Sequence, residues 1–201
     1  MTGKFITLEG MDGAGKSTHI SNIIQILQAH GHEVISTREP GGTALGEKLR
    51  ELLLHESMHP ETETLLMFAA RREHIDQVIS PALARGAYVL SDRFTDATYA
   101  YQCGAKDVPV SKIQLLERWV QADMQPDITL LFDVPVEVSL DRLATARSPD
   151  KFERENAEFF TRIRHAYLQR AIENPARFRV INANKPLEEV KKSVEDIILS
   201  I

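Results

Sequence analysis

The stretch that decides the fold is GMDGAGKS at residues 10–17, which matches the phosphate-loop pattern G-x-x-x-x-G-K-[ST]. The β-rich run FITLE, residues 5–9, precedes it, and residues 16–30 follow it with isoleucines and a leucine along one helical face. A strand before the glycines and a helix after them are the context that a phosphate loop requires. A glycine turn that only starts a helix is the alternative interpretation, and both flanks argue against it.

The residue types in this loop suit an anionic polyphosphate. Glycines allow backbone N–H groups to wrap phosphate oxygens, and the positive end of the following helix dipole favours negative charge there. Lys16 can neutralise the β- and γ-phosphates, and the Ser17 hydroxyl can bind Mg²⁺. The sequence therefore predicts a nucleoside triphosphate with Mg²⁺, bound by Gly10, Met11, Asp12, Gly13, Ala14, Gly15, Lys16, Ser17 and Thr18.

Strand-like and helical segments alternate outward from the loop along the whole chain. This alternation predicts an α/β chain: a three-layer P-loop fold with a central parallel sheet of about five strands, flanked by helices. We expect residues 1–201 to form one domain, with a short lid at about residues 147–153. The other strand-like runs lie at residues 34–37, 88–90, 128–132 and 178–181, and the helical patterns at 16–30, 44–55, 61–85, 96–102, 112–122, 135–146, 156–173 and 187–201.

Composition narrows the classes of function. With 24 basic and 29 acidic residues among 201, the formal net charge is −5, and such a chain is a poor general binder of nucleic acid. Cys103 is the only cysteine, which excludes an internal disulfide and a cysteine-based zinc site. No apolar run approaches the roughly 20 residues that a membrane helix needs. We expect a cytoplasmic protein with neither a nucleic-acid nor a membrane partner.

Charged residues follow other predicted strands, at the edge where a parallel sheet binds ligands. Asp92 and Arg93 come directly after residues 88–91, and Arg38 follows residues 34–37. Asp92 can orient Mg²⁺, and arginine forks can hold phosphate oxygens. Ordinary surface ion pairs are the alternative for each residue, but three strand ends converge here. The chain carries no N/T-K-x-D guanine signature, which argues against a GTPase.

Three further motifs follow the phosphate loop: TREPGGT at residues 37–43, DRF at 92–94 and YQ at 101–102. In this order and spacing, the set resembles bacterial thymidylate kinases along nearly the whole chain. The resemblance implies transfer of the γ-phosphoryl group from ATP to dTMP, with Mg²⁺, to supply dTTP for DNA synthesis. It also implies a homodimer that pairs through helices. A deoxynucleoside kinase is the nearest alternative, although a nucleoside has no phosphate for Arg38 to hold, and a nucleotide-hydrolysing switch is a more distant one.

The resemblance implies roles at the phosphate and the sugar of the acceptor. Arg38 and Arg93 would hold the monophosphate, and the loop carboxylate of Asp12 would accept the sugar 3′-hydroxyl. Tyr101 would crowd the 2′ position and so favour deoxyribose, because a side chain that fills that space rejects an added hydroxyl.

The family also stacks an aromatic ring on thymine and binds the base with an arginine one helical turn later. In MFAARR, residues 67–72, we favour Phe68 as the stacking residue and Arg71 as the base donor, with Arg72 as the alternative. A gapless match to the family pattern instead puts Met67 at the aromatic position. Thr98 and Gln102 would hydrogen-bond the base, so that the predicted dTMP site comprises Asp12, Arg38, Phe68, Arg71, Arg93, Thr98, Tyr101 and Gln102.

Some members of the family carry a catalytic arginine in the phosphate loop, but Gly13 and Ala14 leave no basic group there. The resemblance then implies a cation from the lid, with Arg147 as the first candidate and Lys151 as the second. The predicted catalytic set is Lys16, Arg93, Arg147, Asp12 and Arg38, the predicted metal ligands are Ser17 and Asp92, and Arg142 and Asn182 would flank adenine.

Overall fold

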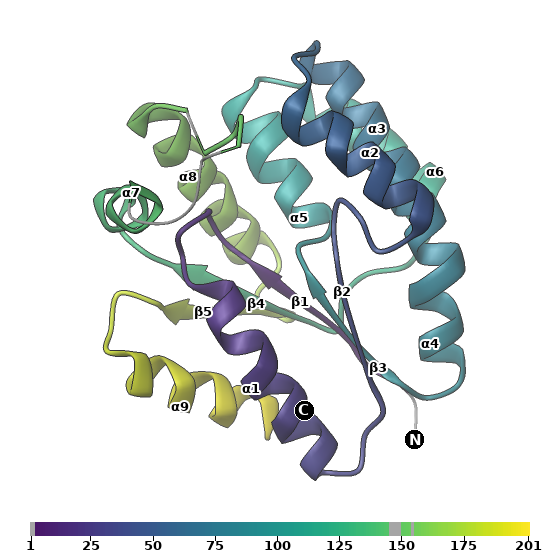
Figure 1. Ribbon diagram of the computed structural model, residues 1–201, viewed down its shortest axis with the longest axis vertical. Helices are drawn as coiled ribbons and strands as arrows, with labels where there is room; N and C mark the ends of the chain where they lie inside the picture. The colour runs from purple at the N-terminus through teal and green to yellow at the C-terminus, as the bar shows by residue number, and fades with distance from the viewer. Residues whose placement is uncertain (1–2, 145–149, 154) are drawn as a thin grey trace.

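The computed structural model describes residues 3–144, 150–153 and 155–201. In this part of the chain, five parallel strands form one sheet in the order β2-β3-β1-β4-β5 (Figure 1). The strands are β1 (Phe5–Glu9), β2 (Val34–Arg38), β3 (Tyr88–Asp92), β4 (Ile128–Asp133) and β5 (Phe178–Asn182). The prediction of a parallel α/β fold is confirmed.

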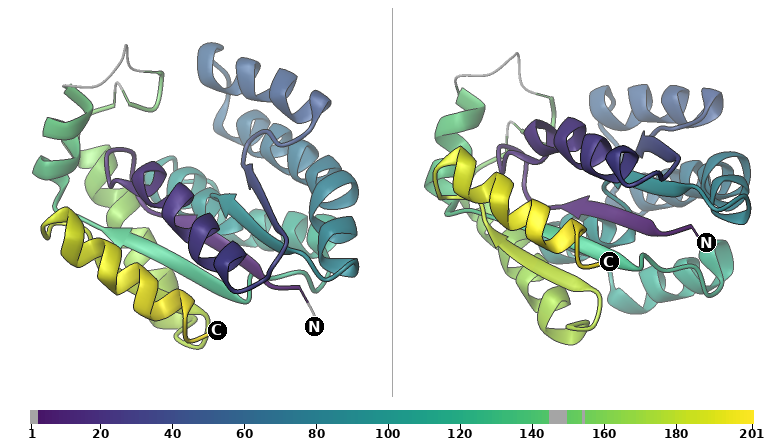
Figure 2. Two further views of the ribbon diagram at one scale, coloured as in Figure 1. Left: turned by 60° about the horizontal axis from the view of Figure 1, so that its bottom comes forward. Right: turned by 90° about the horizontal axis from the view of Figure 1, so that it is seen from below.

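Helices cover both faces of the sheet. α1 (Lys16–Ala29) and α9 (Leu187–Ile198) pack together on one face, and α8 (Ala157–Glu173) lies on the other (Figure 2). The remaining helices are α2 (Ala44–His55), α3 (Pro60–His74), α4 (Ser80–Ala84), α5 (Thr95–Thr98), α6 (Val110–Gln121) and α7 (Val136–Ala144).

The central strands are buried on both faces, which explains their nearly continuous apolar sequences. Ile6, Leu8 and Leu130 are fully buried in the main core. Two buried threonines pair across this core: the hydroxyl groups of Thr7 and Thr129 lie 3.0 Å apart on neighbouring strands. The sheet is therefore a rigid base for the side chains at its carboxyl edge.

Two helices expected to be continuous are interrupted by π-helical turns. The pattern at residues 61–85 forms α3, the π turn η1 (Ile75–Ile79) and α4, and the pattern at 96–102 forms α5 and the π turn η2 (Tyr99–Ala105). A π turn holds more residues than an α turn, so it rotates the side chains that follow it. Apolar periodicity does not reveal such a turn.

The expected lid lies only partly within the described residues, which include 150–153 of it.

Across the described ranges, the helices lack the combined length and apolar character that a bilayer crossing requires.

Candidate active site

The loop between β1 and α1 packs so closely against neighbouring backbone that two of its glycines leave no room for side chains. Gly10 and Gly13 have φ values of 134° and 78°, and a Cβ on Gly13 would lie 2.5 Å from the carbonyl oxygen of Ser139. Lys16 is buried, and its Nζ donates to the carbonyl oxygens of Gly10 at 2.9 Å and Met11 at 3.0 Å. Burial, followed by the nearby charge of Arg93, lowers the pKa of Lys16. The loop therefore presents backbone N–H groups and one enclosed ammonium group, as a phosphate site requires.

A groove on the α9 side of the loop could receive a nucleotide base. It is lined by Thr18, Arg142, Ala183 and Lys185, among others. Arg142 bridges its two walls, since its guanidinium donates to the carbonyl oxygens of Gly13 at 3.2 Å and Ala183 at 3.1 Å.

Asn182, which we expected to flank adenine, does not line this groove. Its exposed side chain instead accepts from the backbone N–H of Asn184 at 3.0 Å. Ala183 and Lys185, just beyond the end of β5, take its place.

A second groove at the sheet edge brings together the two residues predicted to bind metal. Ser17 and Asp92 both line it, and Arg38 lies beside them. The Oδ1 atom of Asp92 is buried and has no hydrogen-bond partner among the described residues. A buried carboxylate oxygen beside a serine hydroxyl fits a Mg²⁺ ion that takes its other ligands from phosphate and water.

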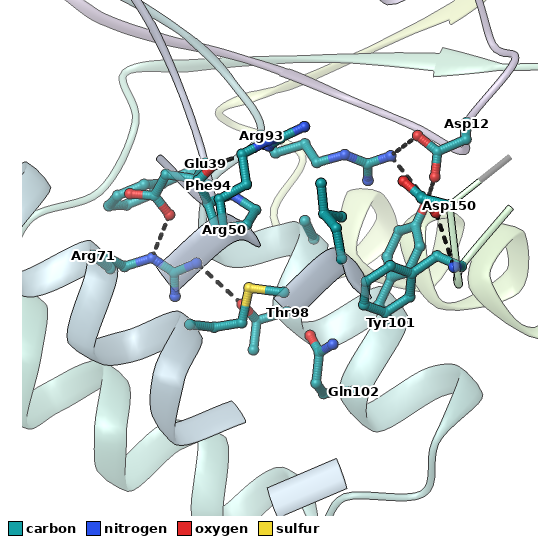
Figure 3. Close-up of a pocket in the computed structure, with 15 residues that line it drawn as sticks. Asp12, Glu39, Arg50, Arg71, Arg93, Phe94, Thr98, Tyr101, Gln102 and Asp150 are labelled. Atoms are coloured by element: carbon teal, nitrogen blue, oxygen red, sulfur yellow. Dashed lines mark hydrogen bonds and ion pairs between the residues drawn. The ribbon is translucent and has the colours of Figure 1, made fainter. Parts of the chain in front are cut away.

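An open-mouthed cavity lies beyond the phosphate loop, between the sheet edge and helices α2 and α3 (Figure 3). Its volume is about 640 Å³, including space open to solvent, which is the size of a small-molecule site. The lining side chains come from six segments: the phosphate loop, the TREPGGT turn, α2, α3, the stretch from Arg93 to Gln102, and residues 150–152. The cavity therefore collects residues that are distant in the sequence.

One end of the cavity is charged and polar. Arg93 donates to Asp12 at 2.6 Å and to the Tyr101 hydroxyl at 2.9 Å, and that hydroxyl donates to Asp12 at 2.7 Å. Burial raises the pKa of Asp12, but the charges of Arg93 and Lys16 and the hydrogen bonds from Tyr101 and Arg93 outweigh it, so the pKa falls to about 2. Asp12 is thus an ionised acceptor at neutral pH.

Arg93 reaches this position through a sharp backbone turn. Its φ is 72°, a left-handed conformation that a non-glycine residue adopts only when its surroundings hold it. The Ser91 hydroxyl donates to the carbonyl oxygen of Arg93 at 2.7 Å, and the next N–H, of Phe94, donates to the buried Glu9 carboxylate at 2.7 Å. Two hydrogen bonds to this turn therefore hold Arg93 at the edge of the sheet.

Glu9 itself is a fully buried carboxyl beneath the site. It also accepts from the Tyr167 hydroxyl at 2.8 Å, and that hydroxyl accepts from Arg93 at 3.1 Å. Burial, with the charge of Asp96 adding to it, raises the pKa of Glu9 to about 8.

The opposite end of the cavity presents donors and acceptors on an apolar floor. Arg71 is buried and donates from Nε to Glu39 at 2.7 Å and from Nη2 to the Thr98 hydroxyl at 3.0 Å. Its Nη1 has no hydrogen-bond partner within the described ranges. The guanidinium carbon lies 4.7 Å from the ring centroid of Phe68 and 5.0 Å from that of Phe94. Arg71 is therefore fixed in place while one donor stays unpaired.

Comparison with known proteins agrees with this geometry. A family model described as thymidylate kinase matches residues 8–194. The chain is 69% identical to a thymidylate kinase from Methylobacillus flagellatus, over 98% of both chains, and 60% identical to one from Cupriavidus metallidurans, over 100% of both. The chain belongs to the thymidylate kinase family. Its fold matches the crystal structure of thymidylate kinase from Ehrlichia chaffeensis with a TM-score of 0.80 at 33% identity, over 98% of this chain and 99% of that one. The resemblance inferred from the motifs is thus confirmed.

Six of the eight residues predicted for the acceptor line the cavity together. These residues are Asp12, Arg71, Arg93, Thr98, Tyr101 and Gln102. Arg72, the alternative to Arg71, is directed elsewhere and donates to the backbone of Val120 at 2.9 Å.

Phe68, which we favoured as the residue that stacks on the base, does not line the cavity. Phe68 is buried in a separate cluster with Tyr99 and Ile113, where it supports Arg71 from behind. Met67 lines the cavity instead. Both residues are compatible with a shared helical face in the sequence, and only the rotation of α3 against its neighbours separates them.

Arg38 also lies outside the cavity. Its guanidinium forms an ion pair with Glu47 at 2.8 Å, and it lines the neighbouring groove. Arg50, one helical turn after Glu47 on α2, lines the cavity in its place and was missed from the sequence. A helical arginine twelve residues after Arg38 carries no local signal of this role, because the chain must first fold back between the two.

Of the two lid candidates, only Lys151 belongs to the described residues. Arg147 lies outside the described residues. Lys151 is described, and its ammonium group lies 2.9 Å from both the Glu63 carboxylate and the carbonyl oxygen of Glu56. Its charge is therefore paired with residues before and on α3.

Proposed function

We propose that this protein transfers the γ-phosphoryl group of ATP to dTMP, giving ADP and dTDP for the supply of dTTP. The observation that carries the proposal is the position of Asp12, which belongs to the phosphate loop and also lines the cavity. A triphosphate on the loop and an acceptor in the cavity would meet at this residue. Direct in-line transfer then needs position and charge from the protein, and no covalent enzyme intermediate.

The phosphate loop would hold ATP through its backbone N–H groups and the ammonium group of Lys16. Arg142 and the groove beside it would receive adenine. The Ser17 hydroxyl and the Asp92 carboxylate would hold Mg²⁺, which supplies charge neutralisation at the β- and γ-phosphates when bound. The buried, unpaired Oδ1 atom of Asp92 supports this assignment.

Arg93 and Arg50 would hold the acceptor phosphate. Arg50 is partly buried, and its pKa is lowered by burial and then by the charge of Arg38, with a further contribution from Arg93. Among the described residues, no carboxylate forms an ion pair with Arg50, so an anionic ligand would relieve this repulsion. Asp12 would accept the sugar 3′-hydroxyl, and the Tyr101 ring would limit the space beside the sugar.

The base would lie at the opposite end of the cavity, over Met67. Thymine presents the acceptor O4 and the donor N3–H on one edge. The unpaired Nη1 of Arg71 can donate to O4, and the amide of Gln102 can accept from N3–H.

We further propose that Arg147 supplies the lid cation at the transferred phosphoryl group. The pairing of Lys151 with Glu63 favours Arg147. To reach the phosphoryl group, Lys151 would have to break its ion pair with a buried carboxylate, which costs free energy. The Arg147→Ala variant is expected to lower kcat by about 10³-fold or more with a much smaller change in dTMP affinity. A larger loss of kcat in Lys151→Ala would transfer the role to Lys151.

We also propose that the chain acts as one catalytic domain in the cytoplasm and as a homodimer that pairs through α3 and α6. These helices pack against each other and expose Leu65, Leu115 and Trp119, which are 55%, 60% and 79% accessible. Sedimentation over a range of protein concentrations tests the dimer; a monomer at micromolar concentration would contradict it.

A coupled assay of ADP release tests the reaction. ATP and Mg²⁺ are supplied with dTMP, thymidine, dCMP or no acceptor in parallel reactions. We expect turnover with dTMP and little with the others. Faster turnover with thymidine would identify a deoxynucleoside kinase, and ADP release without an acceptor would identify a hydrolase.

A further inference from the structure

A buried carboxylate behind the base end of the cavity has no role in the reaction as described so far. Glu63, on α3, is fully buried, yet it does not line the cavity. Its oxygens accept from Nε2 of Gln102 at 2.8 Å and from the ammonium group of Lys106 at 2.8 and 2.9 Å, and Lys151 lies at 2.9 Å. Two lysines thus balance the charge of a carboxylate whose other side-chain hydrogen bond, among the described residues, is to an uncharged amide.

That contact determines which way the Gln102 amide faces. An ionised carboxylate only accepts hydrogen bonds, whereas an amide carries one donor end and one acceptor end. Gln102 must therefore turn its nitrogen to Glu63, which directs its oxygen away from that carboxylate. Gln102 is itself buried and its side chain extends to the cavity (Figure 3).

The orientation matters because pyrimidines differ in hydrogen-bond polarity. Thymine offers a donor at N3 and an acceptor at position 4, whereas cytosine offers an acceptor at N3 and a donor at position 4. An acceptor at Gln102 together with the unpaired donor of Arg71 matches thymine at both positions. Cytosine would oppose like groups at both. To accept cytosine N3, the amide would have to rotate and break its bond to Glu63.

We propose that Glu63 is a positioning residue that holds the Gln102 oxygen toward the base and so makes the site select thymine over cytosine monophosphates. This inference rests on the proposed function. Glu63 contacts no substrate; it acts through the amide alone.

The test compares dTMP with dCMP on one preparation of each variant. The ratio of their kcat/KM values does not depend on the folded fraction, so a loss of stability cannot imitate the effect. In Glu63→Gln, residue 63 becomes an amide that can donate or accept, and the Gln102 amide is free to turn. We expect the ratio to fall by about 10- to 100-fold, because dCMP would no longer have to break the charge-assisted hydrogen bond between Gln102 and residue 63. This fold-change corresponds to the free energy of one such bond.

Two controls isolate the amide. Glu61→Gln removes a more exposed carboxylate on the same helix, paired with Lys112, and should leave the ratio unchanged. In a Gln102→Ala background there is no amide to orient, so adding Glu63→Gln should leave the ratio unchanged as well.

Four results would decide against the inference or against its premise. A native ratio in Glu63→Gln, or an equal fall with and without Gln102, would overturn the positioning role. If Glu63→Gln does not fold, Glu63→Asp is used instead: the shorter side chain keeps the negative charge near the lysines but moves the carboxylate away from the Gln102 amide. A native ratio in Glu63→Asp would likewise overturn the positioning role. Failure of the native protein to phosphorylate dTMP would instead reject the proposed function.

Discussion

Two arginines near the acceptor differ in the environment that the structure gives them, and their substitution provides a direct test of the site. Arg50 lines the cavity and donates a hydrogen bond to the carbonyl oxygen of Pro40 at 2.9 Å. Arg38 is half exposed and paired with Glu47. Replacing each by methionine keeps the apolar stem of the side chain and removes the charge, so the two variants are matched.

The expected magnitudes follow from these environments. A charge-assisted hydrogen bond to phosphate contributes about 1.5–3 kcal/mol, so Arg50→Met should lower kcat/KM for dTMP by about 10- to 150-fold, chiefly through KM. An exposed ion pair contributes about 0.2–1 kcal/mol, so Arg38→Met should change kcat/KM by less than about sixfold. Arg50→Met should not change KM for ATP appreciably, because Arg50 lines neither the adenine groove nor the groove of Ser17 and Asp92.

The assay is coupled ADP release with dTMP varied at saturating ATP, and thermal unfolding serves as the control for folding. A larger effect of Arg38→Met than of Arg50→Met would refute the reasoning. In that case the acceptor phosphate would lie in the groove beside Asp92, and the cavity would not be the acceptor site.

Three further predictions concern the phosphate loop, the base and the buried carboxyl. Lys16→Ala should lower kcat by about 10²- to 10³-fold or more in a folded protein, since the ammonium group meets charge that develops during transfer; a near-native kcat would contradict this. Met67→Ala should raise KM for dTMP with little change in Tm, whereas Phe68→Ala should cost about 3–5 kcal/mol of unfolding free energy; the reverse pattern would restore Phe68 to the cavity. Because the folded state keeps the proton of Glu9 up to a pKa of about 8, against 4.5 for an ordinary glutamate, stability should fall as pH rises through this window, by at most about 1.4 kcal/mol per pH unit. Urea unfolding should show a flatter pH dependence for Glu9→Gln, and an unchanged slope would mean that Glu9 is not the titrating group.

The parts of the site that could be predicted from sequence are those that follow from local pattern. The phosphate loop is contiguous, Asp92 ends a buried strand and Arg93 directly follows it, so the parallel sheet alone brings them together. The positions of Tyr101 and Gln102 in the site could be predicted from the family pattern, without knowledge of how distant segments pack.

The parts that could not be predicted depend on packing between distant segments. The choice between Met67 and Phe68 turns on the rotation of α3, about 100° per residue, and both residues satisfy the same apolar spacing. Arg50 enters the cavity only because α2 folds back over the TREPGGT turn. The interaction of Glu63 with Gln102 joins α3 to the π turn η2, a link that no local pattern indicates.

The TREPGGT turn shows that a motif can be identified from sequence while the contacts of its side chains cannot. Its arginine, Arg38, attracts attention because a phosphate needs a cation, yet in the structure that charge is paired with Glu47. Its glutamate, Glu39, is buried instead, and one of its oxygens accepts from Arg71 while the other lies 2.8 Å from Nδ1 of His74. A Cβ on Gly42 would lie 2.5 Å from the His74 ring, so the glycine is needed for this approach. The turn therefore holds Arg71 in the cavity through Glu39, whereas the cations that we propose for the acceptor phosphate are Arg50, on α2, and Arg93.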